Sequence, residues 1–272
     1  MTRISKDAVP EAGSVTELRV SAGRHVSAAG AEYAREKVGH ALDYASEPVL
    51  SARVRLTGHR DPAAVNPFVA QVNVNMSGRA VRVQAAGVST REAIDLVAAR
   101  VKARLERLAR HWEAVRGGRG EVTAHEWRHG GAARQRLPFF PRGAEDRQVV
   151  RRKAYALATE TCDEAAFDLE LMDYEFQLFT ESGSGIDSVL YRRDGGGYRL
   201  AQIDPRPDEV ARGATAFTIS PTPAPTLELD GVIARLELTG WPFVFFRDRA
   251  LDRGSVLYHR YDGHYGMITP AA

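Results

Sequence analysis

Apolar and polar residues alternate along three stretches near the start of the chain. From Ser51 to Thr57, from Val69 to Met76 and from Arg79 to Ala85, apolar side chains occupy every second position. A period of two is typical of strands that bury one face, and Ser77-Gly78 is a tight hairpin signal. A shorter strand is predicted over Leu18–Ser21. The opposite face of the predicted sheet is polar and carries Arg53, Arg55, Asn73, Asn75, Arg82 and Gln84.

Two other stretches have the helical period. Ala28–Tyr44 repeats its apolar residues at helical spacing and stops before Pro48. Ser89 and Glu92 form a capping-box pattern that opens a second helix, which reaches about Trp112. The predicted order is β-α-β-β-β-α. Since a helix joins the first two strands, we expect them to be parallel, with both helices on one face of a four-stranded sheet.

The remainder of the chain contains an internal repeat. Residues 163–199 and 230–266 align without a gap at a shift of 67, with thirteen identical positions, among them the Ser-Val-Leu-Tyr runs that begin at Ser188 and Ser255. Each copy is predicted to form a leading strand (152–158; 216–219), a helix (162–172; 227–238) and three short strands. A copy of about 55 residues is too small to bury a full core alone, so we expect the two copies to pack on each other.

The full prediction is an α+β fold with four segments. Residues 14–115 form the N-terminal β-α-β-β-β-α domain, and residues 148–205 and 213–271 form two small α+β repeats that make a pseudo-symmetric pair. Residues 116–147 contain two Gly pairs and no periodic apolar face, which is typical of a flexible basic linker.

Composition limits the class of protein. The net charge of +2 conceals an asymmetry: residues 1–115 carry 17 Lys/Arg against 12 Asp/Glu, and residues 153–272 carry 11 against 19. Because the N-terminal part of the chain is basic, a polyanion is a candidate binding partner for it. The single cysteine, Cys162, excludes a disulfide framework within the chain. We find no apolar run long enough to span a membrane and no secretory signal, and we therefore expect a cytoplasmic protein without a membrane or DNA partner.

The second predicted helix has a basic side. Arg100, Arg104 and Arg107 share one face at helical spacing, and Lys102 and Arg110 flank it. Such a surface could bind the phosphates of structured RNA, or it could be an ordinary solvated helix face balanced by Glu92, Asp95 and Glu106. The candidate RNA-binding residues are Arg24, Arg35, Lys37, Arg82, Arg100, Lys102, Arg104, Arg107 and Arg110.

Aromatic residues recur in both repeats. They could stack on bases, but their recurrence at strand spacing in an acidic segment favours core and interface positions. The predicted repeat-pairing residues are Phe176, Phe179, Tyr191, Phe243, Phe245 and Tyr258.

One motif suggests an enzyme. His125, Glu126 and His129 match the H-E-x-x-H pattern of zinc hydrolases. The stretch is flanked by glycines and has no apolar neighbours that could dock it in a core, so we predict no metal site there. The sequence shows no phosphate-binding Gly loop and no G-x-S-x-G motif. We predict neither catalytic activity nor a cofactor.

Taken together, these segments resemble the long form of the bacterial ribosome hibernation promoting factors. Residues 72–87 (VNVNMSGRAVRVQAAG) and 89–108 are similar to the family's hairpin and basic second helix. MDYEFQLF, GWPFVFF and the two SVLY segments are similar to its C-terminal dimerisation domain. The resemblance implies binding of the N-terminal domain to the decoding region of the small ribosomal subunit and its rRNA, and silencing of translation in stress or dormancy. By position, it also implies an RNA-facing role for the basic residues named above.

The chain departs from the ordinary long form in one respect, because it carries two C-terminal copies. A tandem pair has an effective concentration on the mM scale, so we expect the copies to pair internally and the protein to act on single ribosomes. This arrangement is similar to actinobacterial dormancy-associated translation inhibitors with duplicated tails. Three alternatives stay open: ribosome dimerisation through another surface, a homodimer, and a protein-interaction module with an acidic repeat.

Overall fold

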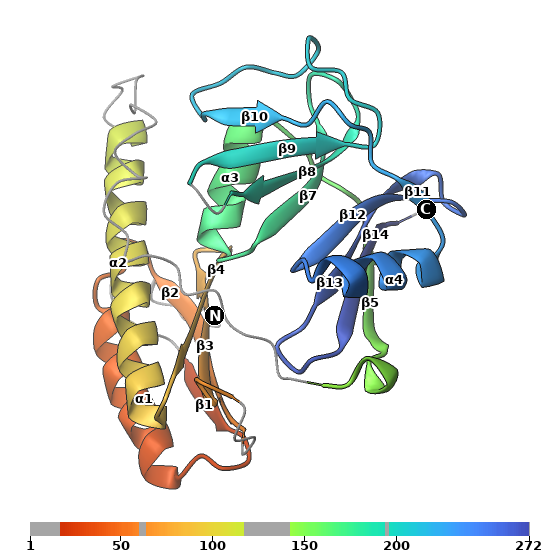
Figure 1. Cartoon of the computed structure of the whole chain (residues 1–272). Coiled ribbons are helices and arrows are strands. Elements are labelled where there is room, and N and C mark those ends of the chain that lie inside the picture. Colours follow the sequence, from red (N-terminus) through yellow and green to blue (C-terminus); the bar gives the residue numbers. More distant parts are fainter. Residues whose placement is uncertain (1–16, 60–63, 117–141, 194–195, 272) are drawn as a thin grey trace, which may run out of the picture. The chain divides into compact units, whose positions relative to one another are not determined.

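The computed structural model describes residues 17–59, 64–116, 142–193 and 196–271. It divides into two compact units, Met1–Leu137 and Pro138–Ala272. Figure 1 labels most of their helices and strands. No helix in the described part of the chain is long and apolar enough to cross a membrane.

The described part of the N-terminal unit contains one four-stranded sheet and two helices. Their order is β1 (Leu18–Ala22), α1 (Ala28–Leu42), β2 (Val49–Gly58), β3 (Phe68–Met76), β4 (Arg79–Gly87) and α2 (Thr90–Arg116) (Figure 1). The strand order in the sheet is β1-β2-β3-β4. β1 and β2 are parallel, and the other pairs are antiparallel. The predicted element order and the predicted parallel pair are confirmed.

Local sequence explains where these elements begin and turn. The Ser27 hydroxyl accepts a hydrogen bond from the backbone N–H of Gly30 and caps α1. At the start of α2, the Ser89 hydroxyl accepts from the N–H of Glu92, whose carboxylate in turn accepts from the N–H of Val88. Ser77 and Gly78 both have positive φ angles, of 50° and 87°. Positive φ at both central residues is the conformation of a two-residue type I′ hairpin turn.

The alternating pattern decides which face of the sheet is buried. The alternating apolar residues are almost fully buried on the side that both helices cover, including Val54 and Leu56 of β2, Val72 and Val74 of β3, and Val81 and Val83 of β4, all at most 2% exposed. α2 completes this core with Ile94, Val97, Val101 and Leu105, all at most 1% exposed. The intervening polar residues of the strands lie on the uncovered face, as predicted.

In the residues that the structure describes, the C-terminal unit contains two five-stranded sheets, each with one α-helix. After the 3-10 helix η1 (Ala144–Asp146), the first repeat contributes β5 (Val149–Tyr155), β6 (Thr159–Glu160), α3 (Cys162–Leu171), β7 (Phe176–Glu181), β8 (Asp187–Arg192) and β9 (Tyr198–Gln202). The second contributes β10 (Phe217–Ile219), β11 (Thr226–Leu227), α4 (Leu229–Thr239), β12 (Phe243–Asp248), β13 (Arg253–His259) and β14 (Tyr265–Pro270). A shift of 67 residues maps each element of the first repeat onto its counterpart.

The leading strands are exchanged between the repeats. The sheet orders are β10-β9-β8-β7-β6 and β11-β12-β13-β14-β5. β5, which precedes the first repeat, therefore pairs with β14 of the second, and β10 pairs with β9 of the first. The sequence predicts both leading strands but not the exchange. A cut between residues 205 and 213 would separate each sheet from one of its edge strands, so the two repeats form one structural body.

Candidate nucleic-acid interface and repeat pairing

The uncovered face of the N-terminal sheet carries two cross-strand rows of polar residues. The register places Arg19 opposite Arg53, Arg53 opposite Asn73, and Asn73 opposite Arg82. The next row runs through Ser21, Arg55, Gln71 and Gln84. Strands are spaced about 4.8 Å apart, so these side chains form one continuous surface of guanidinium and amide groups.

Some cations on this face have acceptors and others do not. Arg19 pairs with Glu17 at 2.5 Å. Gln71 accepts hydrogen bonds from Gln84 at 2.8 Å and from Arg82 at 3.5 Å. Within the described residues, Arg53 and Arg55 have no side-chain acceptor. Arg19, which lies opposite Arg53, is balanced by Glu17, so Arg53 and Arg55 are the cations of these two rows that an anionic partner could pair with.

Two arginines of α2 bond the edge of the sheet. β4 is an edge strand, and Arg100 donates to the carbonyl of Gln84 while Arg104 donates to that of Arg82, at 3.2 Å for the second bond. Four residues of an α-helix rise about 6 Å along the helix axis. Two residues of a β-strand span about 6.6 Å, which is nearly the same distance. The i, i+4 spacing of the arginines therefore matches the spacing of alternate carbonyls.

The residues of the predicted basic face of α2 therefore differ in whether they contact the domain itself or face solvent. Arg104 is only 8% exposed. Arg107 donates to the carbonyl of Ala103 in its own helix. Lys102 lies 3.9 Å from the centroid of the Tyr44 ring and 3.9 Å from Glu106, and a hydrogen bond with Tyr44 raises the pKa of Lys102. Arg110 is exposed.

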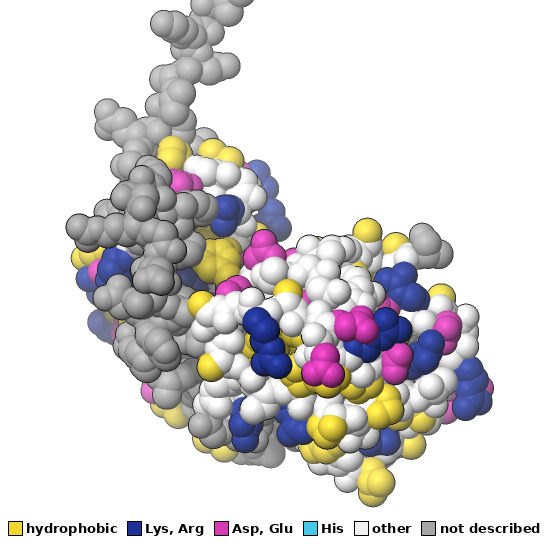
Figure 2. Space-filling view, turned by 90° about the horizontal axis from the view of Figure 1, so that it is seen from above, with side chains coloured by type: hydrophobic (Ala, Val, Ile, Leu, Met, Phe, Trp, Pro, Cys, Tyr) yellow, Lys and Arg dark blue, Asp and Glu magenta, His cyan; other side chains and the backbone are white. Residues whose placement is uncertain are grey.

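The remaining candidate residues lie around α1. Arg24 is exposed in the loop before the helix, and Arg35 pairs with Glu32 at 2.5 Å. Lys37 lies 5.5 Å from the centroid of the Tyr33 ring. Figure 2 shows basic and acidic side chains interspersed on the described surface that is visible in that view. Among the candidate residues, those of the sheet face stand out because the register aligns them in rows. The sequence showed these sheet residues, but only the structure brings Arg19 into the same row.

The two repeats pack through one apolar cluster. It contains Leu178, Val189, Phe245 and Val256, with Phe176, Tyr191, Phe243 and Tyr258 packed against it. Most members form equivalent pairs under the shift of 67: 176 with 243, 178 with 245, 189 with 256 and 191 with 258. The same surface of each repeat thus faces its counterpart, which is the arrangement of a two-fold interface.

Five of the six predicted pairing residues lie in this cluster, and Phe179 does not. Strand residues alternate between the two faces of a sheet, so Phe179 points away from Phe176 and Leu178. Its counterpart Phe246 packs in the core beneath α4, with Val232 and Leu236. Phe179 is fully buried, and its position corresponds to the core of its own repeat.

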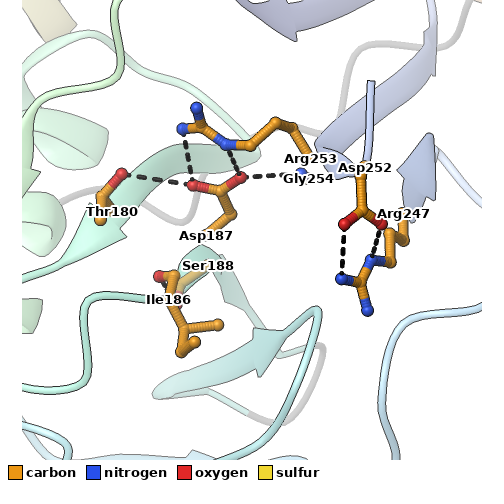
Figure 3. Close-up of polar contacts among 8 residues, drawn as sticks. All are labelled: Thr180, Ile186, Asp187, Ser188, Arg247, Asp252, Arg253 and Gly254. Carbon is orange, nitrogen blue, oxygen red and sulfur yellow. Dashed lines mark hydrogen bonds and ion pairs between the residues drawn. The ribbon is translucent and has the colours of Figure 1, made fainter. Parts of the chain in front are cut away.

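A polar contact also joins the repeats. Asp187 at the start of β8 accepts two hydrogen bonds from the Arg253 guanidinium, at 2.6 and 3.0 Å, and one from the N–H of Gly254 at 2.8 Å (Figure 3). The Thr180 hydroxyl donates to the same carboxylate at 3.3 Å. Asp187 is 4% exposed. The hydrogen bond with Asp187 raises the pKa of Arg253. Sequence reasoning missed this contact, because no motif marks it.

The H-E-x-x-H stretch, His125 to His129, lies outside the described residues. Among the residues that the structure describes, no group of three or more His, Cys, Asp and Glu side chains is placed to hold a metal ion.

Comparison with known families identifies the chain. The model of the sigma 54 modulation protein / S30EA ribosomal protein matches residues 21–112. The model of the sigma 54 modulation/S30EA ribosomal protein C terminus matches twice, at residues 144–200 and 220–267. The chain belongs to the sigma 54 modulation/S30EA ribosomal protein family. It is a long-form member with a duplicated C-terminal domain.

Individual relatives agree with this assignment. A dormancy associated translation inhibitor from Mycobacterium tuberculosis (strain H37Rv) is 32% identical over 262 residues, which cover 93% of this chain and 88% of the relative. A ribosome hibernation promotion factor from Picosynechococcus sp. (strain PCC 7002) is 25% identical over 175 residues, which cover 63% of this chain and 88% of that protein. The relatives are thus a translation inhibitor and a ribosome hibernation factor.

Two solved structures are also similar to part of the chain. A ribosomal subunit interface protein from Coxiella burnetii is 13% identical with a TM-score of 0.29, covering 34% of this chain and 97% of that one. The N-terminal domain of Thermus thermophilus Protein Y is 20% identical with a TM-score of 0.28, covering 35% and 97%.

Proposed function

We propose that this protein is a cytoplasmic ribosome hibernation factor. Its N-terminal unit binds rRNA in the decoding region of the small ribosomal subunit and inhibits translation in stress or dormancy. It acts by occupying a site and has no enzymatic activity. The family assignment supports the ribosome as partner, and the relatives' names support inhibition of translation.

The observation that carries the RNA-binding part of the proposal is the uncovered sheet face with Arg53 and Arg55. These two guanidinium groups lie beside the amide groups of Asn73 and Gln71. Guanidinium groups contact phosphates, and amides can read sugar hydroxyls or base edges, so this chemistry suits structured RNA. The exposed residues Arg24 and Arg110 extend the candidate surface. Arg100 and Arg104 position α2 on the sheet edge.

Paired variants test this assignment. Arg53→Ala with Arg55→Ala is expected to weaken co-sedimentation with the small subunit and to reduce the slope of log K against log salt by about 1.5, because two phosphate contacts are lost. The matched control is Arg212→Ala with Arg235→Ala, which removes two exposed arginines of the C-terminal unit. Equal binding of the two double variants would refute the sheet-face assignment.

Internal pairing of the repeats supports action on single ribosomes. The apolar surface through which a C-terminal domain could join a second molecule is already covered by the other repeat. At a millimolar effective concentration, the internal partner outcompetes one from another chain at cellular concentrations.

One observation favours the alternative of ribosome dimerisation. β5 is a seven-residue edge strand, and such edges can pair with another chain. Its basic run Arg151, Arg152 and Lys153 opposes this alternative, because an antiparallel β5–β5 pair would bring like charges together. We therefore favour the single-ribosome mode.

A further inference from the structure

Two equivalent positions of the repeats meet at the interface. Residues 187 and 254 correspond under the shift of 67, and the N–H of Gly254 donates directly to the Asp187 carboxylate at 2.8 Å. Equivalent positions contact each other only beside the pseudo-two-fold axis of a pair. A symmetric dimer of identical domains would place the same residue on both sides here, whereas this chain places aspartate opposite glycine.

The residues around this point are also unequal. Arg253, the cation that pairs with Asp187, corresponds to Ile186 in the first repeat, and Thr180 corresponds to Arg247 in the second. The first repeat thus supplies the buried carboxylate, and the second supplies its cation and its backbone donor (Figure 3). Each half of the contact depends on the other repeat.

Position 254 cannot carry a side chain opposite Asp187. A Cβ at Gly254 would lie 2.8 Å from the Cβ of Asp187 and 3.0 Å from Cε2 of Phe245. Real Cβ atoms essentially never approach other atoms that closely, and a strand segment packed in the interface has little freedom to move away. The glycine therefore leaves the space that Asp187 fills.

We propose that Asp187, Arg253 and Gly254 make the repeats a hetero-specific pair, in which the first repeat accepts the second and rejects a copy of itself. Two first repeats would bring two buried Asp187 carboxylates together, each with Ile186 where Arg253 should be. Two second repeats would bring two Arg253 guanidinium groups together without a carboxylate. Burying an unpaired carboxylate is strongly unfavourable, which disfavours the pairing of two first repeats. The Arg253 side chain is 45% exposed, so the pairing of two second repeats is disfavoured by the repulsion of like charges and by the loss of the carboxylate.

The proposal also defines which outside partner could fit. A C-terminal domain from another protein matches the first repeat only if it has glycine at the position of Gly254 and a cation immediately before it. The internal second repeat meets both conditions and is tethered. The inference rests on the internal pairing in the proposed function, but its test needs no ribosome, so the two can fail separately.

The first test measures the asymmetric contact in the full-length chain. Asp187→Asn is expected to lower the melting temperature of the C-terminal unit by several degrees, because the buried position 187 then no longer offers a charged acceptor to Arg253 and to the N–H of Gly254. Asp252→Asn is the control. It breaks a bidentate pair with Arg247 of similar geometry within the second repeat (Figure 3), whose carboxylate is 77% exposed. The control should shift the melting temperature by at most about 2 °C.

The second test asks whether the stability of the pair depends on the match between Asp187 in one repeat and Arg253 and Gly254 in the other, rather than on the aspartate alone. Gly254→Asp is expected to lower the melting temperature by roughly 10 °C or to give light-scattering masses above the monomer, because its Cβ would clash with Asp187 and Phe245 and two buried carboxylates would face each other. The mirror variant, Ile186→Arg, Asp187→Gly, Arg253→Ile and Gly254→Asp together, moves the carboxylate, its arginine and the glycine to the other side and leaves Thr180 and Arg247 in place. It should recover at least half of the lost melting temperature and the monomeric mass. Equal effects of Asp187→Asn and Asp252→Asn, or a mirror variant no better than Gly254→Asp alone, would overturn the proposal.

Discussion

Phe176 and Phe243 occupy equivalent positions of the two repeats, and their ring centroids lie 4.6 Å apart. Phe176 also contacts Tyr258, and Phe243 contacts Tyr191, at centroid distances of 5.9 and 5.6 Å. Under the shift of 67 residues, the Phe176–Tyr258 contact is the counterpart of the Phe243–Tyr191 contact. The aromatic cluster forms the centre of the repeat interface and should dominate its stability.

Removing one of these rings should destabilise the C-terminal unit. Phe243→Ala is expected to reduce the free energy of unfolding by about 3 kcal/mol, since aromatic truncation in packed sites leaves a cavity. Trp241→Ala, which removes a 52% exposed aromatic two residues away, should change it by less than about 0.5 kcal/mol. Urea unfolding followed by circular dichroism gives both values. If both substitutions cost the same, the cluster is not the stabilising centre.

The basic face of α2 should separate into residues that fold the domain and residues that bind RNA. Arg104→Ala is expected to destabilise the N-terminal unit by about 2 kcal/mol, because the edge carbonyl of Arg82 loses its charged donor. Arg110→Ala should leave stability unchanged and weaken ribosome binding. Thermal unfolding and ribosome co-sedimentation of both variants distinguish the roles. The assignment is wrong if Arg110→Ala unfolds the domain and Arg104→Ala does not.

Glu181 links the stability of the C-terminal unit to pH. Burial acts to raise the pKa of this carboxyl, but hydrogen bonds from Ser184 and from the N–H groups of Gly183 and Ala211 outweigh it, and the pKa is lowered. A lowered pKa in the folded state contributes stability above the unfolded pKa of about 4.3, which is lost as the pH falls through the folded value. Glu181→Gln should therefore flatten the decline in melting temperature below about pH 5. An unchanged pH profile would contradict this role.

Cys162 should report the opening of the first repeat. The thiol is 1% exposed, and burial, with Glu181 and Asp163 nearby, raises its pKa to about 12. Thiolate is the reactive form, so an alkylating reagent at pH 8 should modify the folded protein very slowly. Because the chain has one cysteine, the modification rate in urea should follow unfolding of this unit. Rapid labelling of the native protein would show that α3 is accessible.

The alternating and helical patterns predicted the N-terminal elements well, because one face of each strand and helix is buried and the other is polar. The repeat was equally visible, since identical residues recur at one fixed shift. The exchange of β5 and β10 was not predictable, because a strand's sequence does not say which neighbouring edge it joins. The roles of Arg100 and Arg104 were also ambiguous, since i, i+4 spacing suits phosphates and strand carbonyls alike.

Sedimentation of ribosomes with a saturating excess of the full-length protein tests the central claim most directly. We expect the protein to co-sediment with single ribosomes in a salt-sensitive manner and no ribosome-dimer peak to form, because the repeats pair internally. A clear dimer peak that depends on the added protein would contradict this claim.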